Sequence, residues 1–318
     1  MKQIQKLDAK GGRKDRGKTI FYWAMLAFPL LQFLIFYVGV NLNSFALAFQ
    51  EFDMYSGDED ALKFVGFDNL WVNFKEVFRN FKENDYLLKA FNNSIIAYLV
   101  GLFVGLTLAL LFSYYLYKKF FMSKFFKVIL FLPFIISSIT LVIIYFFFVE
   151  KAVPAFMEKV TGNDDIVGLL SNQNTEFATI LFFSIWTGFG IQTLIYSSAM
   201  SGISNDIVDA AKIDGVTPMR EFLYIDIPMI MPTIAVFVVS STATVFVNQI
   251  NLFSFYGTDK VSNYDIFTIG YYMYRGVVKD GMSQYPYYAA FGLVMTMITI
   301  PITLIIRALM NKLDPNER

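Results

Sequence analysis

The polar side chains that could bind a ligand lie in stretches that are otherwise apolar. Four of them recur at spacings of three, four and three residues: Ser241, Thr244, Asn248 and Asn251. If the segment is helical, this spacing places all four on one face. Gln249 beside them and Gln192 in an earlier apolar stretch add two amides.

Hydroxyl and amide groups donate and accept hydrogen bonds without the cost of burying a charge. Such a face therefore suits a neutral, hydroxyl-rich ligand. The same groups also suit hydrogen bonds between neighbouring helices in a membrane. Ligand binding and helix packing stay open as alternatives for these six side chains.

The absence of two residue types excludes much of enzyme chemistry. The chain has 0 cysteines and 0 histidines, so it has no thiolate nucleophile, imidazole base, or Cys- or His-ligated metal. Gly12–Thr19 fits the G-x-x-x-x-G-K-[ST] pattern. A phosphate-binding loop, however, needs a strand before it and the helix of a βαβ unit after it. An apolar run follows here instead, and we expect no catalytic residue, no metal site and no ATP hydrolysis by this chain.

The segment 199–228 has the chemistry of two short helices with a tight corner. Gly215 sits where a helix would end in a left-handed residue. Thr217 and Pro218 follow as an N-cap and the first residue of a second helix, which we expect Pro228 to end.

Small and apolar residues in this segment raise the question of a partner. Ala210 and Ala211 would let another surface approach closely, and Phe222 is apolar in a loop expected to be solvated. These features suit docking to a partner protein. They equally suit a hairpin packed under the membrane against the chain's own helices, and the residue types favour neither.

The elements that must position these residues are long and apolar. The chain has 318 residues, of which 56% are apolar and 16% charged, against roughly 25% charged in soluble domains. Six stretches contain no charged residue: 19–49, 92–117, 128–149, 177–198, 229–253 and 288–306. Because about 20 helical residues cross a bilayer core, we predict an all-α polytopic membrane protein with six transmembrane helices. In the second stretch, Gly101 and Gly105 form a G-x-x-x-G pair that indicates close helix packing.

The charges between these stretches give an orientation. The termini and the loops on their side, 118–127 and 199–228, hold 16 Lys and Arg against 9 acids, while the opposite loops hold 10 against 17. The positive-inside rule then places both termini in the cytoplasm. Residues 1–18 form a basic cytoplasmic N-terminus, and 19–318 form the transmembrane domain. The balance of 26 basic and 26 acidic residues gives no sign of nucleic-acid binding.

The segment 199–228 closely resembles the EAA motif of binding-protein-dependent ABC importer permeases. The matching residues are Asp209-Ala210-Ala211, Asp214-Gly215-Val216, Phe222 and Pro228. Trp186–Gly190 resembles the fourth-span pattern of the carbohydrate branch, and Phe64–Asn69 resembles the "FVG-DN" signature of the first permease subunit in maltose and multiple-sugar importers. Two positions depart from the motif, because Asp209 replaces the usual glutamate and Val216 the usual alanine.

This resemblance implies a transport function shared among several chains. The loop between spans four and five would be a coupling helix seated on a separate cytoplasmic ATPase dimer, which would bind the ATP and Mg. The residues implied in that contact are Asp209, Ala210, Ala211, Asp214, Gly215, Phe222 and Pro228. A second homologous permease and an extracytoplasmic solute-binding protein would complete an importer of a sugar or oligosaccharide, in the plasma or inner membrane of a bacterium. The resemblance also favours sugar contact along the fifth span.

Two other classes of protein fit less well. A self-sufficient secondary transporter or channel normally carries acidic or basic residues within its spans, and the six stretches have none. An intramembrane enzyme would lack histidine, cysteine and buried carboxylates for acid–base chemistry. A permease subunit is the leading interpretation.

Overall fold

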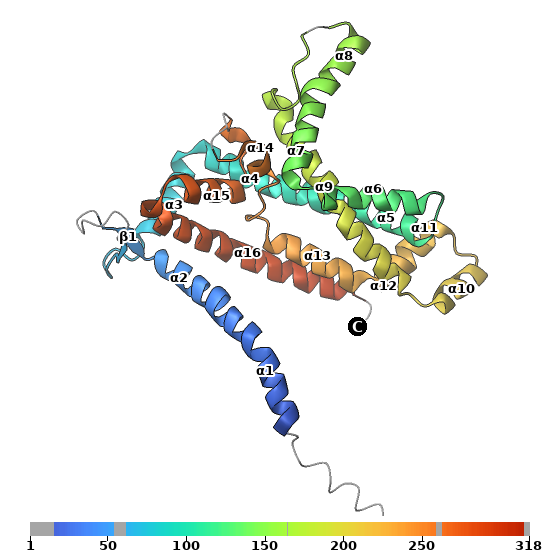
Figure 1. Ribbon diagram of the computed structural model, residues 1–318, viewed down its shortest axis with the longest axis horizontal. Helices are drawn as coiled ribbons and strands as arrows, with labels where there is room; N and C mark the ends of the chain where they lie inside the picture. Colours follow the sequence, from blue (N-terminus) through green and yellow to red (C-terminus); the bar gives the residue numbers. More distant parts are fainter. Residues whose placement is uncertain (1–15, 54–61, 164, 259–262, 315–318) are drawn as a thin grey trace, which may run out of the picture.

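Helices make up most of the chain in the computed structural model, which describes residues 16–53, 62–163, 165–258 and 263–314 (Figure 1). The helices are α1 (Arg16–Gln32), η3 (Phe33–Gly39), α2 (Val40–Leu47), α3 (Val72–Glu83), α4 (Asp85–Val100), η4 (Gly101–Gly105), α5 (Leu106–Tyr117), α6 (Ser123–Ile135), α7 (Ser138–Phe147), η5 (Phe148–Ala152), α8 (Val153–Thr161), α9 (Gln173–Ser201), α10 (Asn205–Ile213), α11 (Pro218–Glu221), η6 (Phe222–Asp226), α12 (Ile227–Met229), α13 (Met231–Ala243), α14 (Leu252–Tyr256), η7 (Tyr264–Ile266), α15 (Ile269–Lys279), η8 (Met282–Gln284) and α16 (Tyr285–Leu313).

Five of the described helical segments are long and apolar enough to cross a membrane. They are Gly17–Leu47, Asp85–Tyr117, Ser138–Thr161, Gln173–Ser201 and Met282–Leu313. Pro218–Met229 and Met231–Ala243 add a sixth if the pair, bent by 69°, is counted as one span. The polytopic helical architecture is therefore confirmed.

Two of the expected spans differ in detail. The stretch 128–149 is divided, because α6 ends at Ile135, two residues after Pro133, and α7 starts at Ser138. Helical structure then continues as far as Thr161. The stretch 229–253 is also shorter as a helix than expected, since α13 ends at Ala243.

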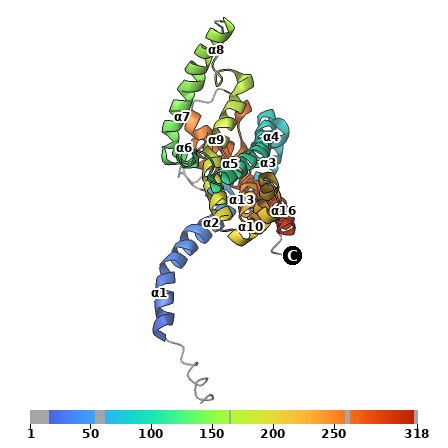
Figure 2. The same cartoon turned by 90° about the vertical axis from the view of Figure 1, so that its right-hand side faces the viewer.

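The long helices pack against one another in pairs. α5 lies along α9, and α13 lies along α16, in both views of the molecule (Figures 1 and 2). One apolar core surrounds Phe183, Tyr271 and Phe291, and a second surrounds Tyr196 and Met200. Gly190 lets α9 approach α6 closely, because a Cβ atom at this position would clash with the carbonyl oxygen of Leu130.

The first helical segment stands apart from this bundle. α1 runs away from the other helices in both views (Figures 1 and 2), and the 18-residue apolar window of Gly17–Leu47 has no buried residue. The first residues of the Gly12–Thr19 pattern lie outside the described residues, and Arg16–Thr19 form the first turn of α1.

A short sheet, which the sequence did not predict, follows this segment. β1 (Gln50–Phe52) pairs antiparallel with β2 (Leu62–Phe64), with Gln50 opposite Phe64. The side chain of Asn73 in α3 donates hydrogen bonds to the carbonyl oxygens of Ala48, at 2.9 Å, and Gln50, at 2.8 Å. The buried amide thus fixes the sheet to the bundle.

Candidate functional site

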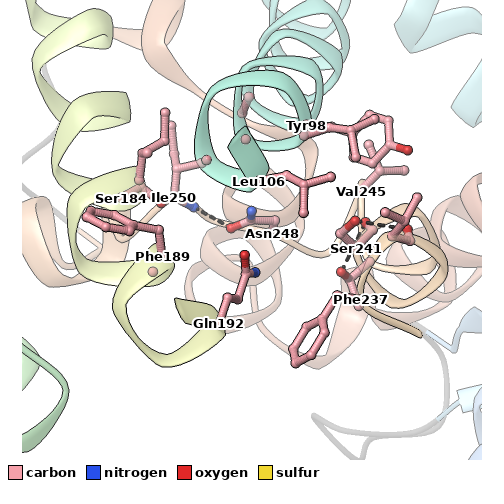
Figure 3. A pocket seen from close by; sticks show the side chains of 18 of the residues that line it. Tyr98, Leu106, Ser184, Phe189, Gln192, Phe237, Ser241, Val245, Asn248 and Ile250 are labelled. Atoms are coloured by element: carbon pink, nitrogen blue, oxygen red, sulfur yellow. Dashed lines mark hydrogen bonds between the residues drawn. The ribbon is translucent and has the colours of Figure 1, made fainter. Parts of the chain in front are cut away.

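A cavity of about 250 Å³ lies among the second, fourth and fifth apolar segments (Figure 3). Its walls come from α4 and η4 on one side, from α9 on another, and from the end of α13 with the residues that follow it. Its polar and glycine residues are Ser94, Tyr98, Gly101, Gly105, Ser184, Gly188, Gln192, Tyr196, Ser241, Thr244 and Asn248.

Four of the six predicted ligand-binding residues line this cavity, namely Gln192, Ser241, Thr244 and Asn248. Gln249 and Asn251 do not. The prediction of a single helical face is wrong, because α13 ends at Ala243. Spacings of three and four residues place side chains on one face only within a helix, so they do not align Thr244, Asn248 and Asn251. Asn248 reaches the cavity through the turns that follow α13 (Figure 3).

Side-chain hydrogen bonds hold this irregular segment in place. Asn248 Oδ1 accepts a hydrogen bond from the backbone N–H of Ile250 at 2.9 Å, and Thr268 Oγ1 donates to the Asn248 carbonyl at 2.9 Å. Ile250 and Asn251 have left-handed φ angles of 45° and 65°. Non-helical backbone at membrane depth is tolerated only where it is buried in protein or lines a water-filled cavity. The segment after α13 meets both conditions, because Phe246 and Ile250 are buried while Thr244 and Asn248 line the cavity.

The cavity offers uncharged hydrogen-bonding groups. Ser241 Oγ donates to the Val238 carbonyl at 2.9 Å and Thr244 Oγ1 to the Ser240 carbonyl at 3.1 Å, so each hydroxyl oxygen keeps lone pairs for a ligand. The Asn248 amide nitrogen forms no hydrogen bond with another described residue. Among the residues that the structure describes, no acidic or basic one lines the walls.

The ligand-binding residues predicted from the sequence include none from the wall formed by α4 and η4. Ser94, Tyr98, Gly101 and Gly105 are spaced by four, three and four residues, so the periodicity argument used for residues 241–251 would have found them. Gly101 was expected in helix packing, but a Cβ atom there would meet nothing within 4 Å. Only Gly105 has the expected neighbour, because a Cβ atom there would lie 3.8 Å from Ile185 Cγ2. Gly101 therefore makes room in the cavity.

The segment 199–228 forms the two predicted short helices. The Ser204 hydroxyl accepts a hydrogen bond from the Asp206 N–H at 3.3 Å and caps α10. Gly215 has the predicted left-handed φ of 72°, and Pro218 is the first residue of α11. The second helix does not end at Pro228: helical backbone continues to Met229, and the bend comes at Ile230.

Three contacts attach this second helix to the end of α5. Lys118 forms an ion pair with Glu221, both largely buried. The hydroxyl of Tyr114 donates to the Pro218 carbonyl at 3.0 Å, and the Tyr114 ring lies 4.9 Å from the ring of Phe222. Phe222 is buried by this contact and so serves the chain's own packing.

α10 carries the exposed part of the segment. Asp209, Ala210, Asp214 and Gly215 are exposed, whereas Ala211 is buried. Asp209 accepts a hydrogen bond from Lys212 at 2.9 Å, which raises the pKa of Lys212. Ile213, an apolar residue at the end of α10, is 86% exposed. The free face of α10 thus combines small, apolar and charged groups.

Several bacterial permease proteins are similar to this chain over most of its length. The permease protein AraP of the arabinooligosaccharide transport system of Bacillus subtilis is 23% identical, over 87% of this chain and 84% of its own length. The permease protein MsmF of the multiple sugar-binding transport system of Streptococcus mutans is 22% identical, over 87% and 90%. The probable ABC transporter permease YurN of Bacillus subtilis is 26% identical, over 91% and 95%.

A solved structure shows the same fold. The crystal structure of a bacterial ABC transporter for import of the acidic polysaccharide alginate aligns with a TM-score of 0.74 at 20% identity, covering 94% of this chain and 98% of the other. Residues 89–318 match the family described as the inner membrane component of binding-protein-dependent transport systems. This match confirms the family that residues 209–228 indicated. The chain belongs to the family of binding-protein-dependent transport system inner membrane components, as a multi-pass protein with the ABC permease fold.

Proposed function

We propose that this chain is one of two permease subunits of an ATP-driven importer, which moves a sugar or oligosaccharide delivered by an extracytoplasmic binding protein. Its relatives include permeases for arabinooligosaccharides, multiple sugars and diacetylchitobiose. The observation that carries the proposal is the neutral cavity at the break after α13, because its amides and hydroxyls match the hydroxyl groups of a sugar.

The size of the cavity supports a second permease subunit. Small-molecule sites span about 300–1,000 Å³, and this cavity of about 250 Å³ falls below that range. A homologous subunit facing this one would enlarge the site across the interface. A solved relative of this fold was crystallised with a periplasmic protein that carries an alginate pentasaccharide, which supports a binding protein as the source of the cargo.

The segment 199–228 supplies the connection to the energy source. We place it in the cytoplasm from the charge distribution of the loops. The exposed face of α10 would dock on the ATPase, while Lys118–Glu221 and Tyr114–Phe222 would transmit its displacement to α5. Asp209, Ala210, Asp214 and Gly215 are the contact residues that this assignment favours. Ala211, Phe222 and Pro228 would act by shaping the segment.

Uptake by two matched glycine variants tests the coupling role. Gly215 and Gly162 have φ angles of 72° and 70°, and neither has an atom within 4 Å of an added Cβ. A valine introduces the same backbone strain at both positions. We expect Gly215→Val to insert normally but to lose most uptake of the cognate sugar, and Gly162→Val at the end of α8 to retain it. Normal uptake by Gly215→Val would refute the coupling role.

A second pair of variants tests the cavity. Gly101→Leu fills open space in the cavity, whereas Val104→Leu adds one methylene group at an exposed position on the same helix. We expect Gly101→Leu to reduce uptake at least about tenfold, with membrane insertion unchanged, and Val104→Leu to have little effect. If both variants transport normally, the cavity is not on the substrate pathway.

A further inference from the structure

A second cavity, of about 340 Å³, lies at the end of the bundle where α4 and α16 begin. It shares no residue with the cavity at the break after α13. Its lining residues are Tyr86, Tyr264, Phe267, Tyr272, Arg275, Gly276, Asp280 and Tyr288. We call the cavity that these eight residues line the aromatic cavity. The charge distribution of the loops places it on the extracytoplasmic side.

Aromatic rings form most of its wall. Tyr86 lies 5.9 Å from Tyr264 and 6.1 Å from Tyr272, and Tyr272 lies 5.9 Å from Tyr288, measured between ring centroids. Gly276 makes room for this arrangement, because a Cβ atom there would clash with the Tyr288 hydroxyl. Tyr264 is 46% exposed, so part of its ring remains accessible from outside.

Arg275 is held in position as a hydrogen-bond donor. Its Nε donates to the Thr258 carbonyl at 3.0 Å. Its guanidinium lies 5.5 Å from the ring centre of Tyr264 and 5.7 Å from that of Phe267. The two terminal nitrogens donate to no described residue. A guanidinium held by two cation–π contacts and by one hydrogen bond thus offers its remaining N–H groups to the cavity.

Asp280 supplies the matching acceptor. The Tyr288 hydroxyl donates to its Oδ2, whereas Oδ1 accepts no hydrogen bond from a described residue. The carboxylate and the guanidinium offset each other's charge. The aromatic cavity therefore combines apolar ring faces with one oriented donor and one oriented acceptor, and its lining carries no net charge.

We propose that the aromatic cavity is a second carbohydrate subsite, at the extracytoplasmic mouth of the permease. This inference rests on the proposed function. A neutral sugar ring has apolar C–H faces that pack on aromatic rings, and a rim of hydroxyl groups that both donate and accept hydrogen bonds. Tyr264 and Tyr272 would pack on the face of the ring, Arg275 would donate to one hydroxyl, and Asp280 would accept from another. A sugar unit bound here would lie on the extracytoplasmic side of the cavity at the break after α13.

Saturation-transfer NMR on the full-length chain in lipid nanodiscs tests the subsite. The probes are maltotriose, an arabinotriose and diacetylchitobiose. We expect at least one to bind, and Tyr264→Ala and Arg275→Gln each to weaken its affinity about tenfold, which corresponds to about 1.4 kcal/mol. Tyr274→Ala, on α15 but outside the aromatic cavity, is the matched control and should bind normally.

Two results would overturn the subsite. One is the absence of saturation transfer from every probe, and the other is unchanged affinity in both Tyr264→Ala and Arg275→Gln. Loss of binding-protein association in these variants, with sugar affinity unchanged, would assign the aromatic cavity to a protein side chain instead. Uptake by the complete importer separates this claim from the proposed function. Uptake abolished by Gly101→Leu but unaffected by Tyr264→Ala and Arg275→Gln would refute only the subsite.

Discussion

Asp226 is a carboxylate buried without a hydrogen-bond partner among the described residues. Its side chain is completely buried, and neither carboxylate oxygen has a hydrogen-bond partner among the described residues. The nearby ammonium of Lys118 is paired with Glu221 instead. A buried and unpaired carboxylate is costly, so Asp226 lowers the stability of the segment that joins α10 to α13.

Replacing Asp226 should therefore stabilise the protein. We expect Asp226→Asn to raise the free energy of unfolding by about 1–2 kcal/mol, because a neutral amide costs less to bury than a charge. The thermal midpoint of the detergent-solubilised chain would rise by a few degrees. Glu221→Gln, which removes one partner of the Lys118 ion pair, is the control and should lower the midpoint. A lower midpoint in Asp226→Asn would show that its carboxylate has a stabilising partner.

At single residues, the sequence predicted backbone conformation better than it predicted the burial of side chains. Gly215 was assigned correctly, because a left-handed corner between two helices restricts the residue type. For Phe222 the residue types allow both docking to a partner and packing within the chain, and the structure packs it against Tyr114. The partner in that contact lies more than 100 residues away in the sequence, where no local pattern indicates it.

At the level of elements, two glycines on α9 have opposite surroundings. A Cβ atom at Gly188 would meet nothing within 4 Å, and Gly188 faces the cavity. A Cβ atom at Gly190 would clash with the carbonyl of Leu130 on α6. The backbone of α6 cannot move away without disturbing its own helix, so Gly190 is required for the contact between α6 and α9.

Alanine at these two positions should therefore have opposite effects. Gly188→Ala should keep or raise stability, by up to ~1 kcal/mol through helix propensity. Gly190→Ala should lower stability by about 1–3 kcal/mol, as overpacking does. Thermal unfolding of the two variants in the same detergent makes the comparison. Equal midpoints would contradict the close approach of α6 and α9.

Helices were easier to predict than their ends. The charge-free stretches located the apolar helices, because a long apolar helix satisfies all of its backbone hydrogen bonds in lipid. The same stretches gave no sign that helical structure stops at Ala243 or divides after Ile135. Tertiary contacts hold the irregular segment that follows Ala243. One example is the hydrogen bond from Thr268 to the Asn248 carbonyl, which joins residues 20 positions apart.

Under the proposed function, the whole molecule works together with partner chains. Its first helical segment has no buried residue across its apolar window, its neutral cavity is below the usual size of a ligand site, and α10 presents an exposed face with Ile213 at its end. Each of these features would be satisfied by another chain. The sequence indicated these partners mainly through the family resemblance of residues 64–69, 186–190 and 209–228, because contacts between chains leave no periodicity in one of them.

Crosslinking from α10 tests most directly whether this chain is driven by a separate ATPase. The chain has 0 cysteines, so Ala210→Cys introduces a single reactive thiol at an exposed position. Ala211→Cys, one residue away and buried, is the matched control. In intact cells we expect Ala210→Cys to crosslink to a nucleotide-hydrolysing protein and Ala211→Cys to do so far less. If neither variant ever reaches such a protein while uptake persists, the central claim is wrong.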